Sequence, residues 1–286
     1  MSAAAASGTF RVEANGLWFH GLAAGPDDGP LVLLLHGFPE FSWGWRHQIG
    51  PLAAAGFRVV AVDQRGYGGT DKPPGVGSYR LDVLADDAAA LVAALGHTDA
   101  VLVGHDWGGI VAWWTAVRHP HAVRRLVILN APHPAVLPGF LLSDPWQLLK
   151  SWYVAFFQLP GVPEWLLARR DFEALRASMR NSALPGAFSR EELSRYQEAW
   201  AAPGALSAML NWYRAIWFPR QDADPAIVQP TLILWGDQDR FLKPGLAEAS
   251  VRLCGDGEIR HFPGATHWLQ HEFPAEVNAA LLAFAR

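Results

Sequence analysis

The chain has almost no cysteine and no recognisable metal motif. Its 286 residues include one cysteine, Cys254, so no disulfide can form within the chain. No Cys-x-x-Cys pair and no cluster of histidine and cysteine is present, and a structural zinc site would need one of these. We therefore expect no metal and no cofactor, and a fold whose stability comes from packing.

Long apolar runs and dense blocks of one charge are also missing. The longest aliphatic run, Leu31–Leu35, is far shorter than the roughly 20 residues of a membrane span. Residues 1–8 have neither the basic stretch nor the apolar core of a secretory signal. The formal net charge is −4, and Lys and Arg form no long cluster, which argues against nucleic acid and anionic membranes as partners. We expect a cytoplasmic protein, and the oligomeric state stays open.

Short apolar runs alternate with helical patterns along most of the chain. Asn15-Gly16 between two apolar runs predicts a β-hairpin. Residues 82–95 place apolar side chains at helical spacing and end at Gly96. Continuous apolar runs, typical of strands covered on both faces, lie at 31–36, 58–63, 100–104, 125–130, 231–236 and 258–262. This alternation predicts an α/β fold with a mostly parallel sheet flanked by helices.

Residues 135–230 differ from the rest, with no convincing strand and several helix starts. Asp144-Pro145 fits an N-cap followed by an N1 proline, and Ser189 with Glu192 fits a capping box. We expect an inserted helical cap at 135–230, between core segments 1–134 and 231–286. Aromatic residues are frequent there, and we interpret most of them as cap core: Trp146, Trp152, Phe156, Phe157, Trp165, Trp200, Trp212, Trp217 and Phe218.

The most informative stretch is Val101-Leu102-Val103-Gly104-His105-Asp106-Trp107-Gly108-Gly109, an apolar strand, a glycine-framed turn and a helix start. Such an elbow usually presents a serine nucleophile above the sheet. Here the exposed group is the carboxylate of Asp106. A carboxylate that attacks a saturated carbon forms an ester that water can cleave, whereas a serine would form an inert ether. Asp106 therefore points to an epoxide or an alkyl halide as the electrophile.

A nucleophilic aspartate needs a base to activate water and an acid to orient that base. His267 follows the run at 258–262, and Asp237 and Asp239 follow the run at 231–236. Both loops should open at the carboxyl edge of the sheet, near the elbow. We take His267 as the base and favour Asp239, further along its loop, over Asp237. His105, beside the nucleophile, is interpreted as structural.

The turn His36-Gly37-Phe38-Pro39 follows the run at 31–36, where a second oxyanion donor should originate. We expect the backbone N–H groups of Phe38 and Trp107 to form the oxyanion hole. Gly37 permits close approach of the backbone, and the isomer of the Pro39 peptide bond is left open.

Over nearly its whole length the chain resembles the α/β-hydrolase-fold epoxide hydrolases and is similar to the soluble members of that family. The resemblance rests on these stretches: His36-Gly37-Phe38-Pro39-Glu40, Asp63-Gln64-Arg65-Gly66-Tyr67-Gly68, Gly104-His105-Asp106-Trp107-Gly108-Gly109, Phe157-Gln158-Leu159-Pro160-Gly161, Asn211-Trp212-Tyr213-Arg214 and the loop of His267. We interpret Asp63 and Arg65 in the second stretch as structural partners that shape a loop below the site.

In that family two cap tyrosines hydrogen-bond to the epoxide oxygen, and by position these correspond to Tyr153 and Tyr213. Ring opening releases a strongly basic alkoxide, which a phenol can protonate. Of the five tyrosines, Tyr67 and Tyr79 lie outside the cap. Tyr196 sits in a polar run that we interpret as a solvated face.

The resemblance implies hydrolysis of a small apolar epoxide to a vicinal diol through an ester on Asp106, which water activated by His267 releases. We expect Phe38, Trp107, Trp152, Trp212 and Trp268 to contact substrate. A haloalkane dehalogenase is the main alternative, although that class usually has asparagine where Phe38 stands. A fluoroacetate dehalogenase would need arginines where Trp107 and Ile110 stand. A catalytically silent ligand binder is the third alternative.

Overall fold

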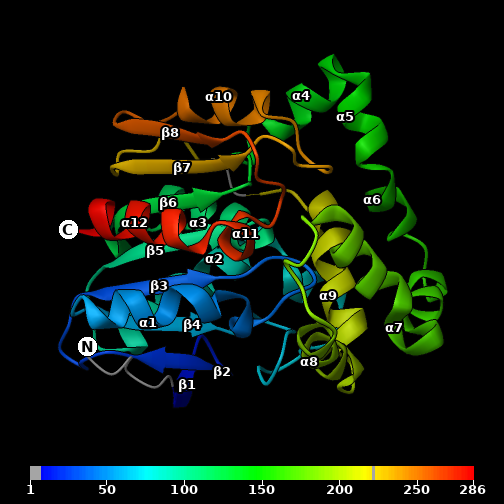
Figure 1. Ribbon diagram of the computed structural model, residues 1–286, viewed down its shortest axis with the longest axis horizontal. Helices are drawn as coiled ribbons and strands as arrows, with labels where there is room; N and C mark the ends of the chain where they lie inside the picture. Colours follow the sequence, from blue (N-terminus) through cyan, green and yellow to red (C-terminus); the bar gives the residue numbers. More distant parts are fainter. Residues whose placement is uncertain (1–7, 221–222) are drawn as a thin grey trace.

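Eight strands form one sheet in the order β1-β2-β4-β3-β5-β6-β7-β8 in the computed structural model, which describes residues 8–220 and 223–286 (Figure 1). The strands are β1 (Gly8–Ala14), β2 (Leu17–Ala24), β3 (Leu31–Leu35), β4 (Arg58–Val62), β5 (Ala100–His105), β6 (Val123–Leu129), β7 (Thr231–Gly236) and β8 (Gly257–Phe262). β2 is antiparallel to β1 and to β4, and all other neighbouring strands are parallel. The predicted α/β fold and its strands are confirmed.

The hairpin between β1 and β2 turns at Asn15 and Gly16, whose φ angles are 46° and 72°. Positive φ at both central residues is the requirement of a type I′ turn, and Asn-Gly meets it at little cost.

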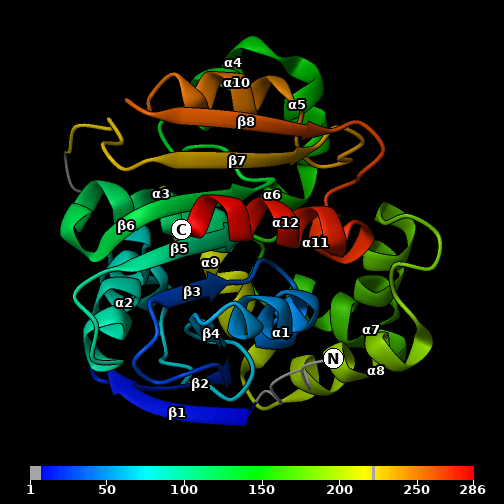
Figure 2. The ribbon, with the colours of Figure 1, turned by 60° about the vertical axis from the view of Figure 1, so that its left-hand side comes forward.

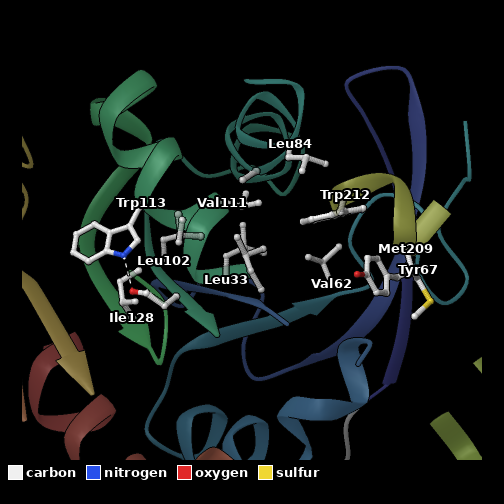
Figure 3. Packing of buried hydrophobic residues seen from close by; sticks show 14 of the residues in the cluster. Leu33, Val62, Tyr67, Leu84, Leu102, Val111, Trp113, Ile128, Met209 and Trp212 are labelled. Carbon is white, nitrogen blue, oxygen red and sulfur yellow. Dashed lines mark hydrogen bonds between the residues drawn. The ribbon is translucent and has the colours of Figure 1, made fainter. Parts of the chain in front are cut away.

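Residues alternate along the parallel strands between two buried layers. Leu33 and Leu35 face one layer with α2 (Leu81–Ala94) and α3 (Trp107–Arg118), and Figure 3 shows Leu33 beside Leu102, Val111 and Val62. Leu34 and its equivalents face the other layer, which α1 (Arg46–Ala54) and α12 (Pro274–Ala285) cover. Because both faces are buried, the strands are apolar throughout.

A run of helices joins β6 to β7. It comprises α4 (Leu137–Ser143), α5 (Pro145–Lys150), α6 (Trp152–Phe156), α7 (Val162–Ser182), α8 (Arg190–Ala201) and α9 (Ala205–Arg214). The backbone of α7 leaves helical geometry at residues 169–172. In Figures 1 and 2 the parallel strands run toward these helices, so the carboxyl edge of the sheet faces them. We call the helices of residues 137–217 the cap; its treatment as a separate domain stays a prediction.

Local signals in the cap are confirmed. The Asp144 side chain accepts hydrogen bonds from the backbone N–H groups of Trp146 and Gln147 at the start of α5. Ser189 and Glu192 form the expected capping box on α8. The remaining helices are α10 (Gly245–Val251) and α11 (Leu269–Glu272), with 3-10 turns at Ser42–Trp45, Val76–Tyr79, Pro120–Ala122 and Ala215–Trp217.

The expectation that most cap aromatics form its core is wrong. Phe157, Trp200 and Trp212 are buried, but Trp146, Trp152, Trp165 and Trp217 are between 59% and 73% exposed, and Phe218 is 40% exposed. A high aromatic content therefore did not indicate burial here.

Tyr196 also differs from expectation. Its side chain is fully buried, and its hydroxyl donates to Glu40 Oε1 at 2.7 Å. The polar neighbours of Tyr196 lie on other faces of α8, so the composition of the run did not predict the environment of one position.

No helix in residues 8–220 and 223–286 has the length and apolar character needed to cross a membrane. Within those same ranges, no group of three or more His, Cys, Asp or Glu side chains is placed to hold a metal ion.

Candidate active site

Asp106 lies in the turn between β5 and α3, at the carboxyl edge of the sheet. Its φ and ψ are 51° and −121°, a conformation that non-glycine residues rarely adopt and that presents the side chain away from the sheet. Small neighbours make the turn possible. A Cβ on Gly37 would run into the Asp106 side chain, and a Cβ on Gly108 would run into the carbonyls of Leu35 and His36. The glycines around the elbow therefore allow three backbone segments to meet at the nucleophile.

His267 lies between two carboxylates. Its Nδ1 is 2.7 Å from Asp239 Oδ2 and its Nε2 is 3.5 Å from Asp106 Oδ2. Asp239 also accepts from the Asn130 amide at 2.7 Å and from the backbone N–H groups of Phe241 and Leu242 at 2.7 and 3.0 Å. These donors hold the buried Asp239 as an acceptor, so His267 carries a proton on Nδ1 and turns Nε2 toward Asp106.

Asp237, the alternative to Asp239, is elsewhere. Its Oδ1 lies 2.6 Å from His261 Nδ1, in a pair that is partly open to solvent. The structure brings together Asp106, Asp239 and His267 and leaves Asp237 outside this group.

The pKa of His267 reflects its two acidic neighbours. Burial alone would lower this pKa, but the charge of Asp239 and the hydrogen bonds with Asp106 and Asp239 raise it to about 10. Burial would raise the pKa of Asp106, but the hydrogen bond and charge of His267 outweigh it and lower the pKa of that carboxyl. In the resting protein Asp106 is ionised and is therefore able to act as a nucleophile.

The turn after β3 supplies a donor to the nucleophile. The Phe38 N–H donates to Asp106 Oδ1 at 2.9 Å, and the Phe38–Pro39 peptide bond is cis. His36 supports the turn: its Nδ1 contacts the Gly37 carbonyl at 2.9 Å, and its Nε2 accepts from the Gln64 N–H at 3.1 Å. Trp107 is the first residue of α3, so its N–H lies among those that have no partner within the helix.

Tyr153 of α6 and Tyr213 of α9 meet above the elbow, with ring centroids 5.9 Å apart. Tyr213 packs edge-on against Phe38 at 5.2 Å and Trp107 at 5.1 Å. Burial raises the pKa of both phenols, and the negative charge of Asp106 raises each further. Both hydroxyls therefore stay protonated at neutral pH and remain proton donors within the electrostatic reach of the carboxylate.

These features agree with the comparisons to known proteins. A family model described as the alpha/beta hydrolase fold matches residues 30–274. The chain belongs to this family. It is 46% identical to the AB hydrolase superfamily protein YfhM of Bacillus subtilis over 96% of both chains, and 40% identical to epoxide hydrolase 3 of Xenopus tropicalis over 98% of this chain and 77% of that one. An epoxide hydrolase of Bacillus megaterium, solved with an inhibitor, superposes with a TM-score of 0.87 at 31% identity and covers 96% of this chain and 99% of that one.

Beneath the elbow of this α/β-hydrolase lies a buried network around Glu40, which sequence reasoning missed. Glu40 Oε1 accepts from Tyr196 at 2.7 Å and from His271 Nε2 at 2.8 Å, and Oε2 accepts from Gln270 at 3.2 Å. Burial would raise the pKa of Glu40, but the charges and hydrogen bonds of His271 and His105 keep it well below its usual value. Glu40 thus joins the cap helix α8 to the core as an ionised acceptor.

His105 connects this network to the loop that carries His267. Its Nε2 lies 2.8 Å from the His267 carbonyl, which can only accept, so Nε2 carries the proton. Its Nδ1 lies 3.1 Å from the Gln270 amide. His105 therefore supports the backbone of the loop that carries His267, which agrees with its expected structural role.

Asn130 and Phe241 contact the predicted site residues and were also missed, and Phe157, expected only as cap core, packs against Tyr213 at 4.9 Å. Asn130 bonds Asp239 and accepts from the Gly236 N–H at 2.8 Å. Phe241 packs against His267 at 5.2 Å and against Tyr153 at 6.0 Å. Asn130 is the last residue of the apolar run at 125–130, and a polar side chain at the carboxyl end of a predicted strand was the one signal that could have singled it out.

The expected substrate contacts fall into two groups. Phe38 and Trp107 pack against Tyr213 beside the nucleophile. Trp152 is 66% exposed, Trp212 is buried with its indole N–H on the Arg65 carbonyl at 3.0 Å, and Trp268 is buried with its N–H on Ser182 at 2.9 Å. These three tryptophans therefore lie at the surface or within the packing around the site.

Asp63 and Arg65 have separate partners. Asp63 accepts from the Ser42 N–H at 2.8 Å and the Gly69 N–H at 2.9 Å, whereas Arg65 forms a buried bidentate pair with Asp87 at 2.6 Å. Each residue is structural, but the two do not act as a pair with each other.

Proposed function

We propose that the protein is an epoxide hydrolase that converts a small apolar epoxide to a vicinal diol through an ester on Asp106. One observation carries the proposal: two protonated phenols, which pack together and against Phe38 and Trp107, lie within the electrostatic reach of the ionised elbow carboxylate. An epoxide needs both groups at once, since its carbon accepts the nucleophile while its oxygen requires a proton. A departing halide needs no proton donor, so the phenol pair favours the epoxide over the alkyl halide.

The contacts of the carboxylate assign different tasks to its two oxygens. Oδ1 accepts from the Phe38 N–H, which leaves Oδ2 as the attacking atom. Oδ2 bonds to the epoxide carbon as the ring C–O bond breaks, and the ring oxygen takes a proton from Tyr153 or Tyr213. Oδ1 then becomes the ester carbonyl oxygen and is already placed at the Phe38 N–H, with the Trp107 N–H as the second donor.

The second half of the reaction uses His267. Esterification removes the negative charge of Asp106, one of the groups that raise the pKa of His267, so the imidazole more readily loses a proton, which goes to the phenolate left by ring opening. The neutral Nε2 accepts a proton from water, which attacks the ester carbonyl. Asp239 holds the tautomer that this step needs and stabilises the imidazolium that forms. When the tetrahedral intermediate collapses, the product oxygen leaves with the imidazolium proton as the second hydroxyl of the diol, and the Asp106 carboxylic acid returns its proton to His267 and is restored as the carboxylate.

The decisive test is a single turnover of styrene oxide in ¹⁸O-water with enzyme in excess. In the covalent route the diol takes its oxygen from Asp106, and water oxygen enters the protein. We expect an unlabelled diol and label in the peptide that contains Asp106. Label in the diol, with none in that peptide, would refute the ester mechanism.

Trapping provides a second readout of the same proposal. The His267→Gln variant should form the ester and fail to release it, so its mass should increase by that of one epoxide. Asp239→Asn should slow the same release step, and Asp237→Asn, at a residue whose side chain pairs with His261, is the matched control. Bromide release from a bromoalkane by the unchanged protein, without diol formation, would favour the dehalogenase, and no turnover of either substrate would favour a silent binder.

For substrate contacts we propose Phe38 and Trp107, which lie nearest to the elbow among the expected residues. An apolar substrate fits this aromatic enclosure. A cytoplasmic location stays a prediction that rests on the sequence.

A further inference from the structure

Two residues of the family-like stretches have no task in the reaction described above. Gln158 follows α6, which carries Tyr153, and Arg214 ends α9, which carries Tyr213. Their polar groups bond to the ends of these two helices.

Gln158 joins the two helices through one amide group. Its side-chain nitrogen donates to the Val154 carbonyl at 3.0 Å and to the Tyr213 carbonyl at 3.0 Å. Carbonyls in the last turn of a helix have no partner within the helix, and both acceptors are of this kind. The backbone N–H of Gln158 donates to the Ala155 carbonyl, so the Val154 carbonyl accepts from the side chain of Gln158 and not from its main chain. The side-chain amide of Gln158 thus links the carbonyl of Val154, the residue after Tyr153, to the carbonyl of Tyr213.

Arg214 makes the reciprocal link from α9. Its Nε donates to the Phe157 carbonyl and its Nη2 to the Leu159 carbonyl, both at 3.0 Å. Glu164 of α7 holds the guanidinium with bonds of 2.7 and 2.9 Å. A cation at the carboxyl ends of two helices is also favourable for their dipoles. The segment after α6 is therefore attached to α9 from both sides.

This attachment matters because α6 has only five residues. A helix of that length is not stable alone, so contacts with its surroundings must set its orientation. Two phenols can donate to the same epoxide oxygen only when their hydroxyls are held at a matching separation, and a displacement of about 1 Å can reduce a rate by about 100-fold.

We propose that Gln158 and Arg214 are positioning residues that clamp the ends of α6 and α9 and so hold Tyr153 and Tyr213 together on the oxygen of the substrate. The clamp rests on the proposed function. It acts in ring opening only, because His267, Asp239 and the oxyanion donors all lie on the core side.

The test measures the two half-reactions separately with styrene oxide. Gln158→Leu removes both donated bonds at similar volume and should slow ester formation on Asp106 by about 10-fold or more, with the rate of ester hydrolysis unchanged. Arg214→Lys keeps the positive charge but loses the forked guanidinium group. It should also slow ester formation without changing ester hydrolysis, by a smaller factor than Gln158→Leu. Gln229→Leu is the matched control, since Gln229 is buried and donates to the Pro120 carbonyl at 3.0 Å on the far side of the core. It should leave both rates unchanged.

A double-mutant cycle separates positioning from general weakening of the fold. With Tyr153→Phe the pair is already broken, so adding Gln158→Leu should cost less than threefold. Three outcomes would each overturn the clamp. Gln158→Leu could slow ester formation as much in the Tyr153→Phe protein as in the unchanged protein, it could slow both half-reactions equally, or the folded variant could form the ester at the unchanged rate. If Gln158→Leu does not fold, Gln158→Asn, one methylene shorter, is judged by the same criteria. Failure of the unchanged protein to form any ester would instead overturn the proposed function.

Discussion

The charge on His267 depends on the two carboxylates that flank it. With both ionised, its pKa is raised from 6.5 to about 10 against the effect of burial. After alkylation only Asp239 remains. We expect ester hydrolysis to follow an apparent pKa clearly below 10, whereas His267 in the free protein should titrate near 10. Single-turnover rates across pH, set beside an NMR titration of His267, measure the two values, and equal values would contradict the coupling.

The same shift predicts a dependence of stability on pH. A folded pKa above the unfolded one means that the ion pairs of His267 stabilise the protein fully below about pH 6.5 and lose this contribution as pH rises toward 10. Asp106→Asn removes one partner and should reduce this loss. Urea unfolding at a series of pH values from 6 to 10 measures it, and identical profiles for both proteins would show that Asp106 does not contribute.

Each of the two phenols should increase the rate of ring opening by a large factor. We expect Tyr153→Phe or Tyr213→Phe to slow ester formation by about 100-fold, and the double variant to abolish it, because the ring oxygen then has no proton donor as its bond to carbon breaks. Rapid-quench mass spectrometry of the ester on Asp106 follows this step. Tyr79→Phe is a control outside the cap, where the hydroxyl bonds to the Pro73 carbonyl. Alkylation at the unchanged rate in the double variant would remove the main support for an epoxide substrate.

Among the elements, the start of α3 packs directly against the backbone of the sheet. Gly108 brings this helix against the end of β3, where the carbonyls of Leu35 and His36 occupy the space of a side chain. Gly108→Ala should therefore destabilise the protein by at least about 1–3 kcal/mol, since the obstacle is backbone. Gly50→Ala in α1 is the matched control, because open space surrounds that position and alanine favours a helix. Urea unfolding compares the two, and similar stabilities would show that the elbow can relax.

At the scale of the whole molecule, most of the large apolar side chains that are exposed in the described residues lie in or beside the cap. Trp146 is 70% exposed, whereas Trp200 is 2% exposed and donates to the Pro39 carbonyl at 2.6 Å. Trp146→Ala should change the free energy of unfolding by less than about 0.5 kcal/mol. Trp200→Ala should cost about 3–5 kcal/mol, because it leaves a cavity between cap and core. A large loss from Trp146→Ala would mean that this tryptophan is covered in solution.

The amino-acid sequence alone predicted the sheet, the elbow and three residues that the structure brings together, Asp106, Asp239 and His267. Strands buried on both faces are apolar throughout, and parallel strands bring the loops that follow them to one edge. Asp106, Asp239 and His267 could be placed together for this reason, from local patterns that need no knowledge of the cap.

The remaining features depend on contacts between segments far apart in the chain. Glu40 meets Tyr196 across 156 positions and His271 across 231. The polar neighbours of Tyr196 predicted an exposed side chain, and the aromatic content of the cap predicted a buried Trp146. Both predictions are wrong, because burial depends on which surface packs against the residue. Local pattern governs secondary structure, but a side chain's environment is set by its neighbours in space, and only the folded arrangement supplies them.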